Sequence, residues 1–259
     1  MSAIAVYRGD TLLCRREAPG EVQLCYEGQY LPGDQIFFQS DTSRAVVRVD
    51  GALAPARVYL PKGSFSYRLP LEGDNPDVYP PFAFQGKKHL LELKPDTDEE
   101  YRNLALNPVD QRGETDAFPH VFANVETRNE SQFAARNVID GSHIAYRHGY
   151  WPFQSWGIGA RADAEITLDF GREVEIHRMA LYLRADFPHD AWWVQGRATL
   201  SDGYETTFPL DKLDGPQTVD LGPHRARWVK LDRLIKCDVS SAYPSLRQWE
   251  IYGKDLKAE

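Results

Sequence analysis

Cysteine is scarce in this sequence, and long hydrophobic runs are missing from it. The three cysteines in 259 residues form no Cys-x-x-Cys pair, which argues against a disulfide framework and against a thiolate zinc site. We therefore expect reduced, buried thiols at Cys14, Cys25 and Cys237, with a bridge from Cys14 to Cys25 across a hairpin as the alternative. No window of about 20 apolar residues is present, which excludes a membrane-spanning helix.

A basic segment followed by an apolar run is also missing from residues 1–10, so we expect no secretory signal peptide. The sequence as written predicts a cytoplasmic protein, or an extracellular or cell-surface protein if a leader has been removed. Positive charge is in deficit, because 30 Lys and Arg stand against 38 Asp and Glu and give a net charge of −8 at pH 7. Nucleic acid and anionic membranes are not expected partners, since both require a broad positive surface.

Short apolar segments separated by turn residues fill the first 95 positions. Turn sequences such as Pro-Gly-Asp, Asp-Gly and Pro-Lys-Gly end these segments, and no stretch shows helical periodicity. We expect residues 1–95 to form a small antiparallel β-sandwich domain of unknown role, because they assemble no recognisable set of catalytic residues. The predicted strands are residues 4–7, 11–15, 21–26, 34–39, 45–49, 56–59, 64–69 and 89–93.

The expected domain boundary lies at residues 94–100, an acidic segment interpreted as a solvated connector or a single helical turn. All six tryptophans come after it, which indicates that the two halves bury different cores. Seven further strands are predicted, at residues 165–170, 175–183, 192–200, 206–210, 217–221, 227–231 and 248–252. Alternation of apolar and polar residues assigns their inward positions, which are Ile166, Leu168, Phe170, Met179, Leu181, Leu183, Trp249 and Ile251.

The second half also contains six short motifs. They are Asn-Leu-Ala-Leu at 103–106, Phe-Pro-His-Val-Phe-Ala-Asn at 118–124, Asn-Val-Ile-Asp-Gly at 137–141, Ile-Thr-Leu-Asp-Phe-Gly at 166–171, Arg-Trp-Val-Lys-Leu at 227–231 and Gln-Trp-Glu-Ile-Tyr-Gly at 248–253. In order and spacing they resemble the coagulation factor V/VIII C-type domain, or discoidin domain, whose bacterial members include the family 32 carbohydrate-binding modules. Over residues 101–254 the resemblance implies an eight-stranded jelly-roll sandwich that is not catalytic and binds sugars on loops at one end.

A loop-rich stretch from Asp140 to Asp190 mixes aromatic and charged residues with glycine and proline. Irregular segments longer than about 12–15 residues inside a compact domain are usually functional or disordered, and the many rings here argue against disorder. Sugars present C–H patches beside hydroxyl groups, so flat rings combined with Arg and Asp side chains suit them. The predicted ligand-binding residues are Tyr146, Arg147, His148, Tyr150, Trp151, Arg184, Asp186, His189, Asp190 and Trp193.

Strand parity decides which tryptophans face outward. Trp192 has the parity of the apolar Leu200 and is expected inside, which leaves Trp193 outside as a ligand platform, as a cover for a sheet face or as a contact with the first domain. Trp156 is expected in the core. Trp228 lies on the same strand face as Lys230, opposite the apolar Val229 and Leu231, and is expected at an interface between the domains.

The resemblance also implies a structural calcium ion near the Asp-Gly turn, held by an aspartate and by a later glutamate. Asp140 matches the aspartate, but Gln248 stands at the position of the glutamate. Because calcium prefers charged oxygen ligands, the loss of one carboxylate predicts a weakened site.

Three alternatives to non-catalytic glycan binding fit parts of the pattern. His189 beside Asp186 and Asp190 would suit a metal cluster or a catalytic His–Asp pair, although adjacent loop residues rarely converge on one ion. A glycan-processing enzyme, or its accessory subunit, would need paired carboxylates in a cleft that excludes water. A protein-interaction module would use the same loops, or Trp193 and Trp228, to bind another protein or a second copy of the chain as a homo-oligomer.

Overall fold

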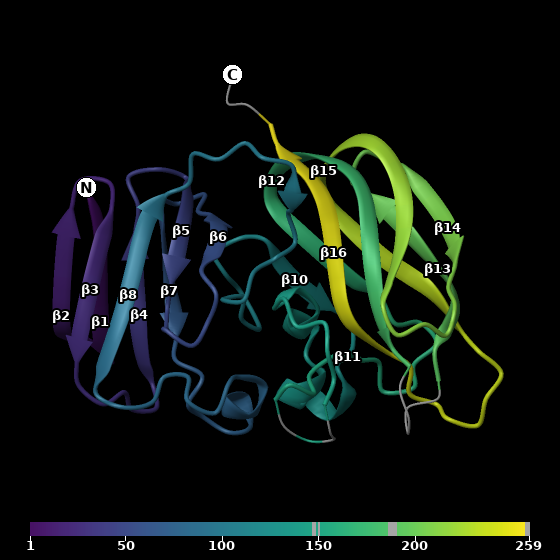
Figure 1. Cartoon of the computed structure of the whole chain (residues 1–259), viewed down its shortest axis with the longest axis horizontal. Coiled ribbons are helices and arrows are strands. Elements are labelled where there is room, and N and C mark those ends of the chain that lie inside the picture. Colours follow the sequence, from purple (N-terminus) through teal and green to yellow (C-terminus); the bar gives the residue numbers. More distant parts are fainter. Residues whose placement is uncertain (147–148, 150, 186–190, 257–259) are drawn as a thin grey trace.

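The computed structural model describes residues 1–146, 149, 151–185 and 191–256. Within this part of the chain, strands form all the long elements, and the helices are short 3-10 segments. Figure 1 shows two β units side by side, the N-terminal unit at the left and the C-terminal unit at the right. The predicted all-β class is confirmed. In the described ranges, none of the helices has the length and apolar character needed to cross a membrane.

The N-terminal unit is a sandwich of two antiparallel four-stranded sheets. One sheet has the order β2-β1-β4-β7 and the other the order β3-β8-β5-β6, which confirms the predicted sandwich. All eight predicted segments form strands, with small changes at their ends. The elements are β1 (Ser2–Arg8), β2 (Thr11–Ala18), β3 (Val22–Glu27), β4 (Asp34–Gln39), β5 (Arg44–Arg48), β6 (Ala56–Tyr59), β7 (Ser64–Arg68), η1 (Asn75–Val78) and β8 (Lys88–Pro95).

Alternation along β3 shows why these segments become strands. Val22, Leu24 and Tyr26 are buried between the sheets, whereas Gln23 and Cys25 are exposed. Each large apolar side chain buried in this way contributes about 1.5–3 kcal/mol. The expectation of buried thiols is therefore wrong for Cys25, whose odd-numbered position places it on the outer face, and Cys14 is only half-buried, whereas Cys237 is buried. All three cysteines are free, so the alternative bridge from Cys14 to Cys25 is not formed.

The C-terminal unit is one continuous antiparallel sheet that folds over on itself. Its order is β11-β16-β12-β15-β13-β14, with β10 beside β12 and β9 beside β16. Its elements are β9 (Arg102–Asn103), β10 (His120–Ala123), η2 (Thr127–Asn129), η3 (Ser131–Phe133), η4 (Ala135–Ile139), β11 (Trp156–Gly157), β12 (Ile166–Arg184), β13 (Trp193–Leu200), β14 (Glu205–Pro209), β15 (Pro216–Lys236) and β16 (Ser245–Asp255).

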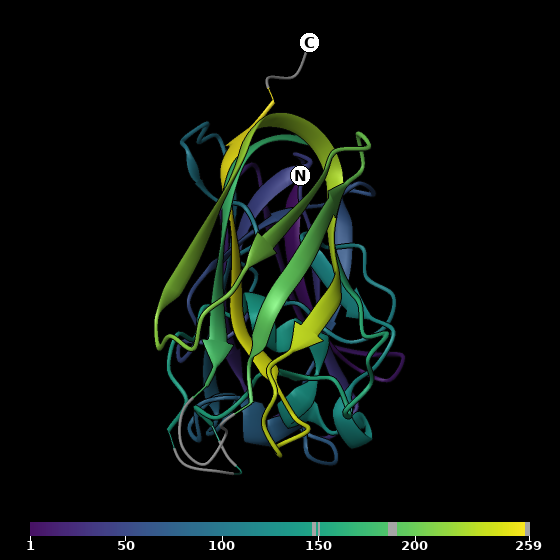
Figure 2. The same ribbon diagram turned by 90° about the vertical axis from the view of Figure 1, so that its right-hand side faces the viewer.

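Two long strands, β12 and β15, run through both layers of the resulting sandwich. Residues 166–169 of β12 pair with β10 and with the end of β15, whereas residues 174–184 pair with β16 and with the beginning of β15. Figure 2 shows both strands arching over at the upper end of the unit. The bend in β12 requires Gly171, because its φ is +70° and a Cβ there would lie 2.5 Å from the ring of Phe118.

A β-bulge in β12 changes which positions face the core. The pairing register shifts between Ile176 and Arg178, so the buried positions change from even to odd numbers. Two predicted strands, 165–170 and 175–183, are thus the two ends of one element. All eight side chains predicted to face inward are buried, namely Ile166, Leu168, Phe170, Met179, Leu181, Leu183, Trp249 and Ile251.

The segment that joins the two units contributes to both hydrophobic cores. Leu104 lies in the C-terminal core, whereas Val109 and Ala117 lie in the N-terminal core. Phe118 then exchanges two backbone hydrogen bonds with Tyr59, of 2.8 and 3.0 Å. Packing and backbone pairing therefore hold the units together, in addition to the chain connection.

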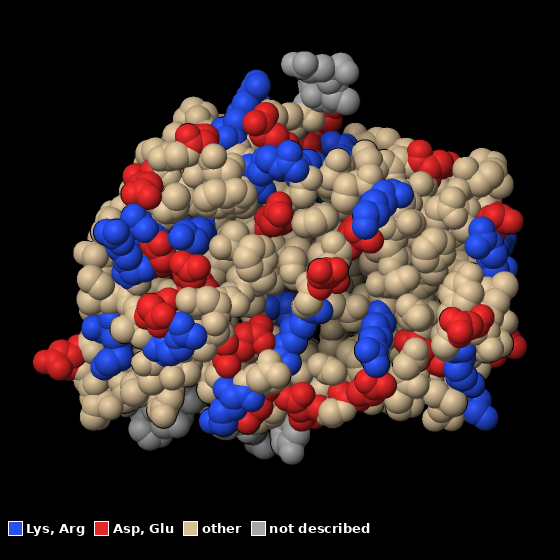
Figure 3. Space-filling view, turned by 180° about the vertical axis from the view of Figure 1, so that it is seen from behind, with Lys and Arg blue, Asp and Glu red and all other residues tan. Residues whose placement is uncertain are grey.

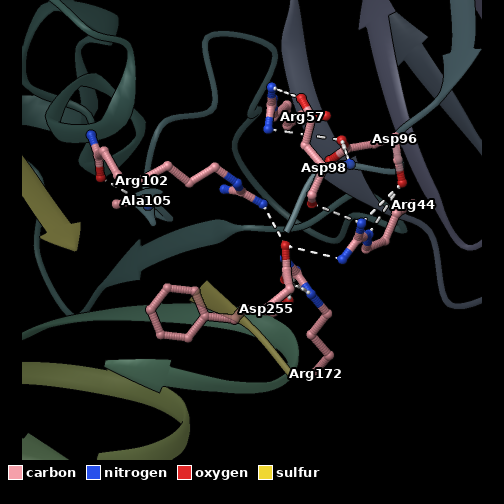
Figure 4. A network of polar contacts seen from close by, with 10 residues as sticks. Arg44, Arg57, Asp96, Asp98, Arg102, Ala105, Arg172 and Asp255 are labelled. Carbon is pink, nitrogen blue, oxygen red and sulfur yellow. Dashed lines mark hydrogen bonds and ion pairs between the residues drawn. The ribbon is translucent and has the colours of Figure 1, made fainter. Parts of the chain in front are cut away.

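A network of arginine and aspartate side chains spans the boundary between the units (Figure 4). At its centre is Asp255 of β16, whose side chain is 3% exposed. It accepts a hydrogen bond of 2.7 Å from Arg102, lies 3.4 Å from the guanidinium of Arg44 and also pairs with Arg172. Because Arg44 belongs to β5 of the N-terminal unit, one carboxylate neutralises charge from both units.

Residues 94–100 form part of this network. Arg57 of β6 pairs with Asp98 and lies 3.8 Å from Asp96, and Arg44 donates to the backbone oxygens of both aspartates. Asp96 is buried. The expectation of a solvated connector is therefore wrong at Asp96, because two arginines of the first unit draw the segment against the protein.

Charges of both signs are intermingled on the molecular surface shown in Figure 3. Basic and acidic side chains alternate there over both units, so that face has no broad region of positive charge. This distribution agrees with the net charge of −8.

Candidate functional site

An open cavity of about 630 Å³ lies at the end of the C-terminal unit where its connecting loops gather. We call it the rim pocket. Four segments that are distant in the sequence supply it: the loop after Gly141, the end of β12, the β14–β15 loop and the start of β16. The described lining residues are His143, Ile144, Ala145, Tyr146, Pro152, Tyr182, Asp214, Gly215 and Arg247.

Backbone hydrogen bonds shape the first of these segments. The amide of Ser142 donates to Asp140 Oδ1 at 2.8 Å, and the amide of Tyr146 donates to the carbonyl of Pro152 at 2.8 Å. Gly141 has a φ of +90°, a conformation that residues with a side chain rarely adopt. The turn therefore points the following loop, with an exposed Tyr146, towards the rim.

Aromatic and acidic side chains support one wall of the pocket. The imidazole of His143 stacks on the ring of Tyr182, with centroids 4.5 Å apart, and its Nε2 lies 2.9 Å from Glu250 Oε1. Tyr252 donates its hydroxyl to Glu250 Oε2 at 2.9 Å. Burial, together with this carboxylate, raises the pKa of Tyr252 to about 12, so the phenol remains a hydrogen-bond donor at neutral pH.

A charged pair forms another part of the wall. The guanidinium of the buried Arg247 donates to Asp214 Oδ1 at 2.6 Å, and the Asp214 side chain is 79% exposed. An arginine offers several donors in a fixed plane, and an exposed carboxylate retains acceptor capacity. The pair can therefore bond to neighbouring hydroxyl groups of one ligand.

The structure brings only part of the predicted ligand site together. Tyr146 is 60% exposed and lines the rim pocket. Trp151 instead lines two small cavities at the boundary between the units, and its backbone N–H donates to the carbonyl of Asp77 at 2.8 Å. Outside the described residues lie Arg147, His148, Tyr150, Asp186, His189 and Asp190.

Arg184 does not face the rim, because it is 2% exposed. Its guanidinium lies 3.6 Å from the centroid of the Phe153 ring and donates to the carbonyl of Phe153 at 3.4 Å. Through these two contacts with Phe153, Arg184 positions the loop that returns to β11. Its expected role as a ligand contact is therefore not supported, and the alternative ion pair with Asp186 falls outside the described residues.

Trp193 points into the core, contrary to the parity argument. It is 1% exposed and packs at 6.1 Å from Trp156, which is buried as expected. The reason is a register irregularity between Trp193 and Gln195, which exchanges the two faces at the start of β13. Trp192 is only partly buried and packs against the edge of the core. The interaction-module alternative therefore loses one of its two tryptophans.

Sequence reasoning missed most of the rim pocket. Tyr182 and Glu250 occupy the outward positions of strands whose inward positions are apolar, and this parity was the available signal. The side chains of Tyr182 and Glu250 come together because Ala180 of β12 pairs with Glu250 of β16. The sequence does not reveal this pairing. Asp214 and Arg247 sit in a turn and at a strand end, where pattern gives no information about partners.

The donor set around Asp140 does not fit the calcium ion implied by the resemblance. Both carboxylate oxygens accept hydrogen bonds, from Ser142 N and from Gln154 Nε2 at 2.9 Å, and Gln248 Oε1 accepts from Gly141 N at 3.2 Å. No group of three or more His, Cys, Asp or Glu suited to a metal occurs among the described residues. Amide donors thus stabilise the turn where a cation would need further charged oxygens.

We expect millimolar calcium, or its removal with EGTA, to leave the melting temperature unchanged. The physical reason is that the neutral Gln248 supplies one weak ligand oxygen and no charge. Differential scanning fluorimetry with magnesium as a control for ionic strength measures this. A rise in melting temperature that is specific to calcium would show that the ion displaces these hydrogen bonds.

No protein-family model matches the sequence, and no curated protein matches it. Among solved structures, the chain is similar to a Streptococcus pneumoniae fucose-binding module, at 15% identity and a TM-score of 0.43, over 61% of this chain and 100% of that one. It is also similar to the family 32 CBM of Clostridium perfringens NanJ in complex with galactose, at 17% identity and a TM-score of 0.39, over 51% and 91%. A further similar structure is chitosan-binding module 1 of a Paenibacillus chitosanase/glucanase, at 18% identity and a TM-score of 0.41, over 60% and 100%.

Proposed function

We propose that this protein binds carbohydrate at the rim pocket and does not transform it chemically. The observation that carries the proposal is the gathering of ring faces and a charged hydrogen-bonding pair around one open cavity. Tyr146 offers an exposed ring, the stacked His143 and Tyr182 form a second flat surface, and Arg247 with Asp214 supplies donors and acceptors.

Sugar chemistry matches this combination. The C–H face of a pyranose packs on an aromatic ring, while its hydroxyl groups need partners that both donate and accept. Glycoside hydrolysis ordinarily uses two carboxyl groups about 5–10 Å apart. Asp214 is the one carboxylate among the described residues that line the pocket, since Glu250 is buried and bonded to His143 and Tyr252. The arrangement therefore favours reversible binding.

Replacing Tyr146 with alanine is expected to weaken glycan binding about tenfold, which corresponds to about 1.4 kcal/mol, because the stacking ring is lost. A glycan array selects the ligand, starting from galactose, fucose and chitosan oligosaccharides, the sugars named for the similar structures. Isothermal titration calorimetry then measures the affinity.

The matched control is Tyr243→Ala, since Tyr243 is 59% exposed and does not line the rim pocket. Its removal should leave the affinity unchanged. Equal losses in both variants would show that the site lies elsewhere, and a broad array without any bound glycan would contradict carbohydrate binding itself.

A further inference from the structure

A second cavity, of about 440 Å³, lies between the two units and shares no lining residue with the rim pocket. We call it the inter-unit cleft. One wall comes from β7 and from the segment that follows it through η1, including Ser66 and Tyr79. The other wall comes from the joining segment and from η3 and η4, including Arg112 and Arg136. Binding cavities commonly form at such boundaries between packed units.

Hydrogen bonds between the two walls fix the shape of the cleft. Ser131 of η3 donates its backbone N–H and its hydroxyl to Asp74, at 2.7 and 2.9 Å. The side-chain amide of Gln111 accepts from the backbone N–H of Arg68 at 3.0 Å and donates to its carbonyl at 2.6 Å. The cleft is therefore preformed, so a ligand would not have to order it.

Arg136 contributes a buried positive charge to the lining of the cleft. The residue is 6% exposed, and its guanidinium donates to neutral oxygens, the carbonyls of Asp110 at 2.8 Å and Pro108 at 3.2 Å and the amide oxygen of Asn137 at 3.4 Å. Its charge also lies over the ring of Tyr79, 5.0 Å from the centroid. Among the described residues, no carboxylate oxygen forms an ion pair with it.

The two aspartates whose charges act on Arg136 are committed to other partners. Asp110 accepts from His120 at 2.7 Å and from the amide of Val121 at 3.1 Å, and Asp140 accepts from Ser142 and Gln154. A buried charge without a close counter-charge is costly. An anion that enters the cleft would supply that counter-charge.

The other arginines of the cleft are already paired. Arg68 contacts Glu72 at 2.8 Å, and Arg112 contacts Glu126 at 2.7 Å. The exposed hydroxyl of Ser66 and the hydroxyl of Thr115 lie along the walls. Glu114 also lines the cleft, so its lining holds three arginines and two glutamates, an excess of one positive charge. The cleft thus combines a buried arginine that forms no ion pair with charged and neutral polar groups around it, and it has the volume of a small molecule.

We propose that the inter-unit cleft binds a small anion that carries hydroxyl groups, with its anionic group at Arg136. The shared chemistry includes sugar acids and sugar phosphates. This site is independent of glycan binding at the rim pocket, and either can exist without the other.

The test is a titration of the full chain, followed by calorimetry and by ligand-observed NMR, with glucuronate, galacturonate, glucose 6-phosphate and inorganic phosphate. Glucose and galactose are the neutral counterparts. At least one anionic sugar should bind, and its affinity should fall about threefold or more between about 0.05 and 0.5 M NaCl. Ser66→Trp, which fills the cleft from β7, should weaken this binding roughly tenfold or more.

Two controls separate the sites. Thr207→Trp adds the same ring on the exposed strand β14 and should change nothing, and Tyr146→Ala should spare the anionic sugar while weakening rim binding. Arg136→Gln should abolish anion binding. If this substitution of a buried residue prevents folding, Ser66→Trp provides the test instead.

Three results would overturn the proposal. The first is that none of the anions binds at millimolar concentration. The second is that Ser66→Trp leaves anion binding intact, or that Tyr146→Ala abolishes it. The third is that inorganic phosphate binds as tightly as every sugar derivative, which would remove the role of the hydroxyl groups.

Discussion

Replacing Asp255 with asparagine is expected to lower the free energy of unfolding by about 3–5 kcal/mol. The substitution keeps the shape of the side chain but leaves Arg44, Arg102 and Arg172 around a neutral amide in a nearly buried position. Burial and the charge of Arg172 already act to lower the pKa of Arg102. Without the carboxylate, the three guanidinium groups would repel one another across the boundary between the units. Urea unfolding followed by tryptophan fluorescence measures the loss.

The matched control is Asp163→Asn, which removes an exposed aspartate that pairs with Arg161. Exposed pairs contribute little, so this variant should unfold at the midpoint of the wild type. A similar midpoint for Asp255→Asn would show that the network does not hold the units together.

The pH dependence gives a second check on Asp255. Burial by itself would raise the pKa of this carboxyl group, but Arg172, Arg102 and Arg44 hold it below its ordinary value. Its contribution to stability is therefore complete above the unfolded-state pKa of about 3.9 and is lost as the pH falls through the lower folded-state pKa. The difference in stability between wild type and Asp255→Asn should shrink over that acidic range and stay constant near neutral pH.

Trp193→Ala is expected to lower the free energy of unfolding by about 3–5 kcal/mol, because it leaves a cavity in the core of the C-terminal unit. The ring is 1% exposed and packs against Trp156. Urea unfolding measures the loss, and calorimetry on the folded variant measures whether glycan affinity changes. We expect a large loss of stability without a specific loss of binding.

Trp192→Ala is the natural control, because it removes the same side chain from the neighbouring position. Trp192 is only partly buried, with Lys212 placed 5.4 Å from its ring centroid, so the loss of stability should be clearly smaller. If instead Trp193→Ala kept its stability and lost glycan affinity, the ring would face the ligand and the burial of Trp193 would be wrong.

Apolar alternation predicted most of the fold. Along β3 and β4, side chains such as Leu24 and Phe38 are buried and alternate with more exposed neighbours, because a strand can bury only every second residue against one partner layer. The short strands β9, β10 and β11 escaped prediction, since two to four residues contain too little periodicity. The course of β12 and β15 through both layers also escaped it, because segments 165–170 and 175–183, and likewise 217–221 and 227–231, were predicted as separate strands.

The candidate site was much less predictable. Tyr146 could be found from its place in an aromatic loop, but Arg184 in the same set of residues is buried beneath Phe153. Composition identifies residues that suit a sugar, whereas exposure depends on how neighbouring loops pack. His143 and Arg247 belong to segments about a hundred residues apart, and only the pairing of β12 with β16 brings them to one pocket.

The amino-acid sequence by itself determined that this chain forms strands and which residues fill its cores. It also determined that the second half contains loops rich in aromatic and charged side chains. These properties depend on local periodicity and on the chemistry of single side chains. Tertiary structure alone decided that Trp193 turns inward, that Asp255 joins the two units and that Arg136 lines a cleft between them. Each of these outcomes depends on a register shift or on a contact between distant segments, and one residue inserted into a strand exchanges its two faces.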